Sequence, residues 1–344
     1  MINSVIKPGA ARGVAAARRL ISPLGPVGGV SLRNSLRPSV HAGSATARNA
    51  PDFSEPDFLF KLLFNTRGYA LGSHRFFMDS AVALLPTPKG ARYRYSRLAG
   101  VPVMWIGGYE KKGGPLLFYL HGGGYVMGSP RTHRSLSAYL CRASKAKGLV
   151  VDYRLAPEHP FPAALEDVLD VYRFLVKNGM DSKNILVAGD SAGGGLTAAL
   201  LLAIARENLP MPCAAHLMSP WADLTASRRY YRFMRHRAKH VVDWGADAMA
   251  AMYVGESDPA DPLISPVYGD FTGVCPMLIT AGRSEPLRHD GRILAEHARS
   301  FGVDARFLPY DGPVHVFQAL APLVGSAEAL IERAGAFFIE QLGQ

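Results

Sequence analysis

The segment 189–193 has the pattern G-x-S-x-G, with Ser191 at its centre. It lies between an apolar run that predicts a strand, 185–188, and one that predicts a helix, 192–205. In this strand–turn–helix context the pattern indicates an exposed nucleophilic serine, because glycines at both ends permit a tight turn. The N-terminus of the helix would direct its N–H groups toward a developing negative charge. Taken alone, the pattern also fits a glycine-rich turn without chemistry.

A second motif, HGGG at 121–124, directly follows a predicted strand at 116–120. Glycines let backbone N–H groups approach a substrate oxygen without obstruction by a Cβ atom, and HGGG accompanies the serine turn in lipases and esterases. The competing interpretation is a phosphate-binding loop. No Lys-Ser or Lys-Thr follows the glycines, and no G-x-G-x-x-G with a downstream acid is present. The two motifs together therefore favour acyl transfer on Ser191.

A serine hydroxyl needs a general base, and α/β-hydrolases place the base last in the chain order Ser, acid, His. His315 follows the last predicted strand, 305–310, on a loop that can turn the imidazole toward the serine. We predict His315 as the general base. The other late histidines lie in a predicted helix, where solvated or capping roles are expected, or in a basic insertion: His289, His297, His236 and His240.

The acid that orients the base should follow the predicted strand 277–280. Glu285 lies on that loop, directly before a proline that opens a helix. Asp290 is the rival, but it falls inside the predicted helix 287–301 and is expected to point outward. Asp311 directly precedes the histidine loop and is expected to be a turn residue. We therefore predict Glu285 as the acid.

The elements that carry these residues alternate between strand and helix from about residue 88. This alternation is typical of a doubly wound, mostly parallel sheet with helices on both faces. Two stretches, 52–87 and 222–262, do not follow the rhythm and are expected to be helical additions over the sheet. The remaining predicted strands are 149–153 and one ending at 216–219; the remaining predicted helices are 163–176 and 327–342.

With these motifs placed, the chain resembles the hormone-sensitive lipase-like family of α/β-hydrolases. The resemblance covers about residues 85–340 in the expected order, and it is nearest to the branch of acetyl-hydrolases and monoterpene ε-lactone hydrolases. The matching segments are HGGGYVMGS at 121–129, YRLAPEHPFPAALED at 153–167, GDSAGGG at 189–195, SPWADLT at 219–225, SPVYGD at 265–270, EPL at 285–287 and PVHVF at 313–317.

The resemblance implies an α/β-hydrolase fold with an eight-stranded sheet. The catalytic domain would span 88–344, and a helical cap would come from 52–87 and an insertion at 222–262. Many relatives carry Asp where this chain has Glu285, and Val316 stands where other branches have glycine. Asp190 and the pair Tyr153-Arg154 match the family and are interpreted as scaffold.

The resemblance also implies a triad and an oxyanion hole, with neither cofactor nor metal. Its triad would be Ser191, Glu285 and His315, and the oxyanion hole would use the N–H groups of Gly123, Gly124 and Ala192. The implied activity is serine-dependent hydrolysis of short- to medium-chain or acetyl esters through an acyl-enzyme. Lactone opening by the same site is the alternative, and a non-catalytic receptor, which the presence of His315 disfavours, is a further one.

Composition excludes several other classes. Of 344 residues, 48% are hydrophobic and 19% charged, which suits a large core. The cysteines, Cys141, Cys213 and Cys275, show no C-x-x-C spacing, so a disulfide scaffold and a cysteine-rich zinc site are excluded. The longest clean apolar run, 196–205, is far shorter than the roughly 20 residues of a membrane-spanning helix.

The net charge of +10 is unevenly distributed. Residues 1–51 hold seven basic residues and no acid, which leaves 31 basic against 28 acidic residues in the remainder. This leader has the composition of a mitochondrial targeting segment, with a disordered extension of a cytoplasmic protein as the alternative. The nearly balanced remainder argues against nucleic acid as a partner. The substrate would be a small-molecule ester or lactone, and the sequence does not indicate an oligomeric state.

One basic and aromatic run, 228–240, lies inside the expected cap insertion. We expect a cap helix with an aromatic face over the pocket and a solvated basic face. Contact with an anionic lipid surface is the alternative, which would suit a lipid-like substrate. A nucleic-acid site is the least favoured interpretation.

Overall fold

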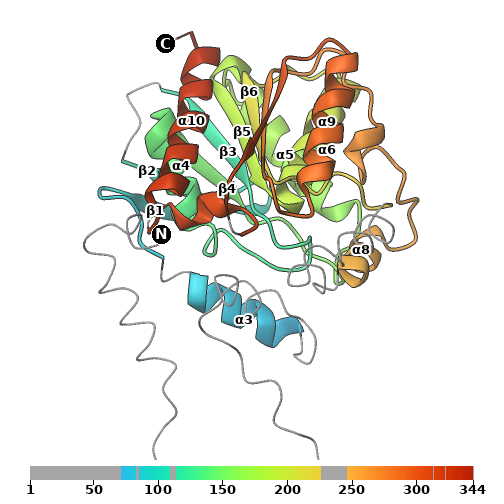
Figure 1. Ribbon diagram of the computed structural model, residues 1–344, viewed down its shortest axis with the longest axis horizontal. Helices are drawn as coiled ribbons and strands as arrows, with labels where there is room; N and C mark the ends of the chain where they lie inside the picture. Colours follow the sequence, from blue (N-terminus) through green and yellow to red (C-terminus); the bar gives the residue numbers. More distant parts are fainter. Residues whose placement is uncertain are drawn as a thin grey trace, which may run out of the picture.

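A single eight-stranded sheet forms the centre of the computed structural model, in the order β1-β2-β4-β3-β5-β6-β7-β8 (Figure 1). Only β2 runs antiparallel to its neighbours, so the sheet is mostly parallel, as predicted. The structure describes residues 71–82, 85–108, 114–225, 246–312, 314–321 and 323–343. The strands are β1 (Arg92–Leu98), β2 (Val101–Gly107), β3 (Leu116–Leu120), β4 (Lys147–Val151), β5 (Ile185–Asp190), β6 (Ala214–Met218), β7 (Met277–Gly282) and β8 (Ala305–Tyr310).

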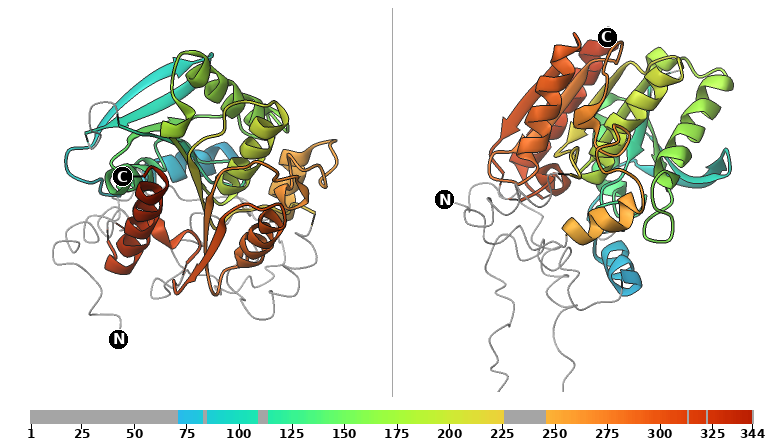
Figure 2. Two further views of the ribbon diagram at one scale, coloured as in Figure 1. Left: turned by 90° about the horizontal axis from the view of Figure 1, so that it is seen from above. Right: turned by 90° about the vertical axis from the view of Figure 1, so that its right-hand side faces the viewer.

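Helices cover both faces of the sheet. Seen from above, α10 and α9 lie on opposite sides of the strands (Figure 2). The buried side chains of α4 and α10 join one apolar cluster, and those of α5, α6 and α9 join another. The predicted α/β-hydrolase architecture is therefore confirmed. These helices are α4 (Arg134–Ser144), α5 (Ala163–Lys177), α6 (Ala192–Arg206), α9 (Arg288–Ser300) and α10 (Gly325–Gln341).

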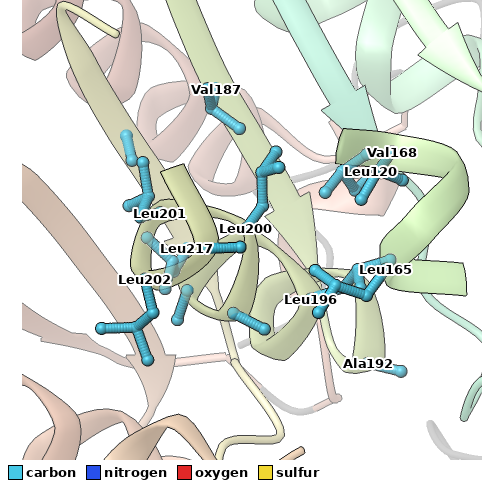
Figure 3. Packing of buried hydrophobic residues seen from close by; sticks show 14 of the residues in the cluster. Leu120, Leu165, Val168, Val187, Ala192, Leu196, Leu200, Leu201, Leu202 and Leu217 are labelled. Atoms are coloured by element: carbon cyan, nitrogen blue, oxygen red, sulfur yellow. The ribbon is translucent and has the colours of Figure 1, made fainter. Parts of the chain in front are cut away.

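The central strands are apolar because both of their faces are covered. In β5, Val187 packs with Leu217 on the side of α6, whereas Leu186 and Ala188 join the cluster on the opposite side. Figure 3 shows the leucines of α6 beside these strands. Helix α6 is buried from Ala192 to Ile204, which accounts for its nearly continuous apolar sequence.

The strand order reverses between β3 and β5, and this reversal places the functional loops. From β3 the chain passes through α4 to β4 on one side, and from β5 through α6 to β6 on the other. In open parallel sheets, ligands bind outside the carboxyl ends of the strands at such a switch point. Leu120 at the end of β3 pairs with Gly189 near the end of β5. The HGGG loop and Ser191 therefore leave the sheet side by side.

Two further helices, α3 (Leu71–Val82) and α8 (Ala246–Val254), lie beyond the carboxyl ends of the strands (Figure 1). Both contact the segment that follows β3. The Arg75 guanidinium on α3 donates to the Val126 carbonyl at 2.7 Å, and Tyr253 on α8 stacks on Tyr125 at 3.6 Å between ring centroids. The rest of the two expected cap stretches, including the basic run at 228–240, falls largely outside the described residues, as does the leader 1–51.

Predicted boundaries agree with the observed ones within a few residues. The predicted strand at 149–153 is β4 at Lys147–Val151, and the strands at 116–120 and 305–310 have the predicted bounds. The hairpin of β1 and β2 and the helix α4 are not among the individually predicted elements. Across the part of the chain that the structure describes, no helix is both long and apolar enough to cross a membrane.

Candidate active site

Ser191 occupies a strained turn between β5 and α6. Its backbone has φ 55° and ψ −122°, a conformation that residues with side chains rarely adopt. Hydrogen bonds to the next strand hold this turn: the Ser191 N–H donates to the Met218 carbonyl at 2.8 Å, and the Trp221 N–H donates to the Ser191 carbonyl at 2.9 Å. The loop after β6 thus fixes the serine backbone from both sides.

The glycines around Ser191 are explained by close approach of backbone segments. A Cβ atom on Gly193 would lie 2.2 Å from the Leu120 carbonyl oxygen, and one on Gly189 would lie 2.2 Å from the Gly193 oxygen. Both distances are shorter than any real contact, so a side chain at either position would displace the turn. The G-x-S-x-G pattern thus packs the serine turn directly against the end of β3.

Glu285 and His315 form a buried pair. Nδ1 of His315 lies 2.7 Å from Oε2 of Glu285, and the two residues are only 7% and 5% exposed. The other carboxylate oxygen, Oε1, accepts hydrogen bonds at 2.6 Å from the Gly282 N–H and from the Ser219 hydroxyl. Both oxygens of the predicted acid are therefore engaged, one of them by the predicted base.

The loop carrying His315 turns sharply after the imidazole. Val316 has φ 49° and ψ 51° and is buried. A β-branched side chain in this left-handed conformation is unusual and stores strain. Asp311 at the start of the loop is exposed and pairs with Arg283 at 3.2 Å, in agreement with a turn residue.

The expectation that Asp290 points outward is wrong. Asp290 is 4% exposed, and its Oδ2 accepts hydrogen bonds at 3.1 Å from the N–H groups of Ala222 and Asp223. Burial raises the pKa of Asp290 to about 8, although these hydrogen bonds act in the opposite direction. The inward direction follows from contact with the loop after β6, which is distant in sequence.

The other late histidines are placed differently. His297 is half-buried, and its Nε2 lies 2.7 Å from the Gly269 carbonyl oxygen, at the end of a short 3₁₀ helix. This contact agrees with a capping role. His289 is partly buried on α9, and His236 and His240 lie outside the described residues.

The HGGG loop follows β3 with two glycines in conformations that favour glycine. Gly123 has φ 122° and Gly124 has φ 63°. A Cβ atom on Gly123 would lie 2.1 Å from the Met127 oxygen, and one on Gly124 would lie 2.4 Å from the Met249 sulfur. These glycines, and Ala192 at the start of α6, lie at the same edge of the sheet as Ser191.

Within the described residues, no group of three or more His, Cys, Asp or Glu side chains is placed so that it could hold a metal ion.

The comparisons with known proteins agree with this geometry. A family model described as "alpha/beta hydrolase fold" matches residues 117–319. An esterase structure from the bacterial hormone-sensitive lipase family superposes with a TM-score of 0.78 at 35% identity, covering 83% of this chain and 97% of that one. The chain belongs to the hormone-sensitive lipase-like family of α/β-hydrolases.

Two curated relatives of this α/β-hydrolase carry names that describe an activity. The acetyl-hydrolase of Streptomyces hygroscopicus is 39% identical over 236 residues, which are 68% of this chain and 78% of the relative. The esterase of Acinetobacter venetianus is 34% identical over 242 residues, which are 70% of this chain and 80% of the relative.

The part that Ser219 plays in this hydrolase is not predicted from the sequence. This residue lies in the SPWADLT segment, which carries the family resemblance, but nothing in that motif predicts a hydrogen bond to Glu285. Ser219 has φ 47°, and its N–H donates to the Thr280 carbonyl at 2.6 Å. Its hydroxyl is thus aimed at the acid by the adjacent strand β7. His133 lies outside every motif, and no sequence signal marks its contact with Asp190.

Polar side chains beneath the acid loop form a buried chain. The Tyr310 hydroxyl donates to Oε1 of Gln318 at 3.0 Å, and Nε2 of Gln318 donates to the Thr280 hydroxyl at 2.9 Å. Nε2 of His216 lies 3.1 Å from the same hydroxyl, and burial lowers the pKa of His216 to about 3. Burial and the nearby Glu285 carboxylate raise the pKa of Tyr310. These hydrogen-bonded side chains are therefore uncharged at neutral pH and place no competing charge beside Glu285.

Proposed function

We propose that this chain, an ester-bond hydrolase by family, cleaves short- to medium-chain carboxylic esters, including acetyl esters, through an acyl-enzyme on Ser191. The observation that carries the proposal is the 2.7 Å contact between the buried Glu285 and His315, on the loops that follow β7 and β8. These loops lie at the same sheet edge as the strained Ser191 turn. The names of the relatives, acetyl-hydrolase and esterase, support the same class of substrate.

In the proposed mechanism, His315 takes the proton of the Ser191 hydroxyl while the serine oxygen attacks the ester carbonyl. Glu285 stabilises the imidazolium through Nδ1 and keeps Nε2 directed at the reacting atoms. Nε2 then gives the proton to the leaving alcohol, which leaves the acyl group on Ser191. Water attacks the acyl-enzyme by the same proton transfers, releasing a carboxylic acid and restoring the serine.

The tetrahedral oxygen would be bound by the backbone N–H groups of Gly123, Gly124 and Ala192. Ala192 is the first residue of α6, so the helix N-terminus adds its positive dipole end. One such donor contributes about 2.7–4 kcal/mol of transition-state stabilisation in a serine protease. The tight packing at all three loop glycines and at Gly193 supports this role, because it keeps the donors in fixed positions.

We also propose that 52–87 and 222–262 form a cap over the catalytic domain 88–344. The contacts of α3 and α8 with the segment after β3 support this division. Met249 of α8 lies against Gly124, so a side chain of the cap would adjoin the oxyanion hole. Such side chains would select the acyl and alcohol groups, and the same site could open a lactone.

Replacing the nucleophile tests the proposal. We expect the full chain to hydrolyse p-nitrophenyl acetate and butyrate faster than the palmitate, and Ser191→Ala to lower kcat by about four or more orders of magnitude. Ser144→Ala is the matched control, because Ser144 is a buried serine whose hydroxyl bonds the Leu140 carbonyl within α4. The assay panel includes lactones, and a preference for them would assign lactone opening as the main activity.

Active-site labelling gives an independent result. A fluorophosphonate probe should label the wild-type chain and Ser144→Ala but not Ser191→Ala. A folded wild-type chain that neither reacts with the probe nor hydrolyses any ester would refute the triad and favour a receptor.

The leader 1–51 is proposed to direct the chain to mitochondria, on the basis of its seven basic residues and absence of acids. In eukaryotic cells, a fusion of 1–51 to a fluorescent protein should localise to mitochondria. Replacing Arg12, Arg18 and Arg19 by glutamine should abolish that localisation. A cytosolic signal from the unaltered fusion would contradict the proposal.

A further inference from the structure

Asp190 and His133 form a contact that the triad does not use. Asp190 is the last residue of β5, directly before Ser191, and His133 directly precedes α4. Nε2 of His133 lies 3.3 Å from Oδ2 of Asp190. The side chains are 16% and 4% exposed. The contact therefore joins the serine turn to a segment 57 residues earlier, largely away from solvent.

The same carboxylate also binds the HGGG loop. Oδ1 of Asp190 accepts hydrogen bonds from the Gly122 N–H at 3.1 Å and from the Tyr119 hydroxyl at 2.6 Å. A Cβ atom on Gly122 would lie 2.3 Å from Oδ2, so the loop backbone rests directly against the carboxylate. Asp190 thus connects the serine turn with Gly122, the residue before Gly123.

The imidazole of His133 is fixed on its other sides. Nδ1 lies 2.7 Å from the Thr132 hydroxyl, and the ring stacks on His121 with 5.5 Å between centroids. His121 in turn stacks on Tyr153 at 4.2 Å, and the Tyr153 hydroxyl donates to the His121 carbonyl at 2.6 Å. The ring therefore presents Nε2 to Asp190 in one orientation.

The charges of the pair reinforce each other. Burial alone would lower the pKa of His133, but the Asp190 carboxylate, the Ser129 carbonyl and the Asp79 charge together raise it above its usual value. Burial alone would raise the pKa of Asp190, but the positive His133 and the surrounding hydrogen bonds lower it. Burial and the His133 charge lower the pKa of His121 to about 3, so His121 is the neutral member of the stack at neutral pH.

We propose that His133 and Asp190 are a positioning pair that holds the HGGG loop in register with the serine turn, so that their N–H groups converge on one oxygen. This inference rests on the proposed oxyanion hole. Gly123 and Gly124 belong to one segment and Ala192 to another, and the Asp190 carboxylate binds across the gap between them. His133 fixes the orientation of that carboxylate.

A positioning role makes a different prediction from a purely structural one. Oxyanion donors act mainly on the transition state, so their displacement lowers kcat more than it raises KM. It also weakens binding of a trifluoromethyl ketone, whose adduct with the serine carries an oxyanion, in proportion to the loss of kcat/KM. A pair that only stabilises the fold would lower the melting temperature without changing either quantity in the folded fraction.

Three substitutions at position 133 separate these roles. The amide nitrogen of glutamine can take the place of Nε2, whereas asparagine is too short and leucine has no donor. With p-nitrophenyl acetate, we expect kcat of His133→Leu and His133→Asn to fall about 10- to 100-fold, with KM changed less than about threefold. His133→Gln should recover most of kcat. His297→Gln, at a half-buried histidine with one carbonyl partner, is the matched control and should match the wild type.

The proposal is overturned if His133→Asn and His133→Gln have equal kcat, or if the trifluoromethyl ketone binds every folded variant as it binds the wild type. Rates are referred to active sites counted with the fluorophosphonate probe, so partial unfolding does not imitate a loss of kcat. If His133→Leu does not fold, the comparison of asparagine with glutamine still decides. Failure of the wild type to react with the probe would instead refute the triad on Ser191.

Discussion

Glu285 uses its length to satisfy two requirements at once. Its Oε2 reaches Nδ1 of His315, while its Oε1 turns back to the Gly282 N–H of its own loop and to the Ser219 hydroxyl. An aspartate side chain is one methylene shorter and would have to span the same three contacts. The glutamate is thus held in one rotamer by donors on two neighbouring strand ends.

This arrangement gives Ser219 a measurable role. Removing its hydroxyl by Ser219→Ala leaves Oε1 with one protein donor among the described residues and loosens the orientation of Glu285. A hydrogen bond to a charged group contributes about 1.5–3 kcal/mol, so kcat/KM for p-nitrophenyl acetate should fall about 10- to 100-fold, chiefly through kcat. Steady-state kinetics on folded protein measure the effect, with Ser144→Ala as the control. Unchanged kcat would show that Gly282 alone holds the acid.

At the scale of elements, apolar strands that are buried on both faces were predictable from sequence. Strand β3 has the predicted bounds, and β5 was predicted up to its last two residues. The side chains of β3 and β5 are buried throughout, so their composition alone marks them. Once the order of strands and loops was set, Ser191, Glu285 and His315 could be placed at one sheet edge.

Elements whose buried side is partly polar were not predicted. Helix α4 buries Leu136, Tyr139 and Leu140, but several of its other buried residues are serines whose hydroxyls bond carbonyl oxygens. Those of Ser137 and Ser144 bond the His133 and Leu140 carbonyls, and that of Ser135 bonds the Pro86 carbonyl. The edge strand β1 has no fully buried residue and carries three arginines in seven positions, so it lacks the apolar run that marks the central strands.

Contacts between distant elements set the remaining limit of sequence analysis. His133 reaches Asp190 because α4 begins beside the switch point between β3 and β5, and no local pattern encodes that distance. Asp290 is buried for the same kind of reason: α9 places its first turn against the loop after β6. A periodicity argument finds the apolar face of a helix, but it does not reveal a polar contact with a loop about 70 residues away.

At the scale of the whole molecule, buried acids make stability depend on pH. Two carboxyl groups among the described residues have raised pKa values. Burial and the nearby Asp79 raise the pKa of Asp152 to about 6, and burial raises the pKa of Asp290 to about 8. An aspartate in an unfolded chain titrates near 3.9. Between these values the folded state retains protons that the unfolded state has released. Stability contributed by the protonated form is therefore complete below about pH 4 and is lost as pH rises toward 8.

Asp290→Asn isolates the larger of these effects. The asparagine amide oxygen can still accept hydrogen bonds from the Ala222 and Asp223 N–H groups, but the side chain does not ionise. Each pH unit between folded and unfolded pKa corresponds to about 1.4 kcal/mol, so the variant should exceed the wild type in unfolding free energy by about 2 kcal/mol or more at pH 9. At pH 4, close to the pKa of an unfolded aspartate, the difference should be small. Urea unfolding at both values measures it, with the exposed Asp311→Asn as control. If the wild type matched the variant at pH 9, the carboxylate of Asp290 would be stabilised in the fold as well as it is in water.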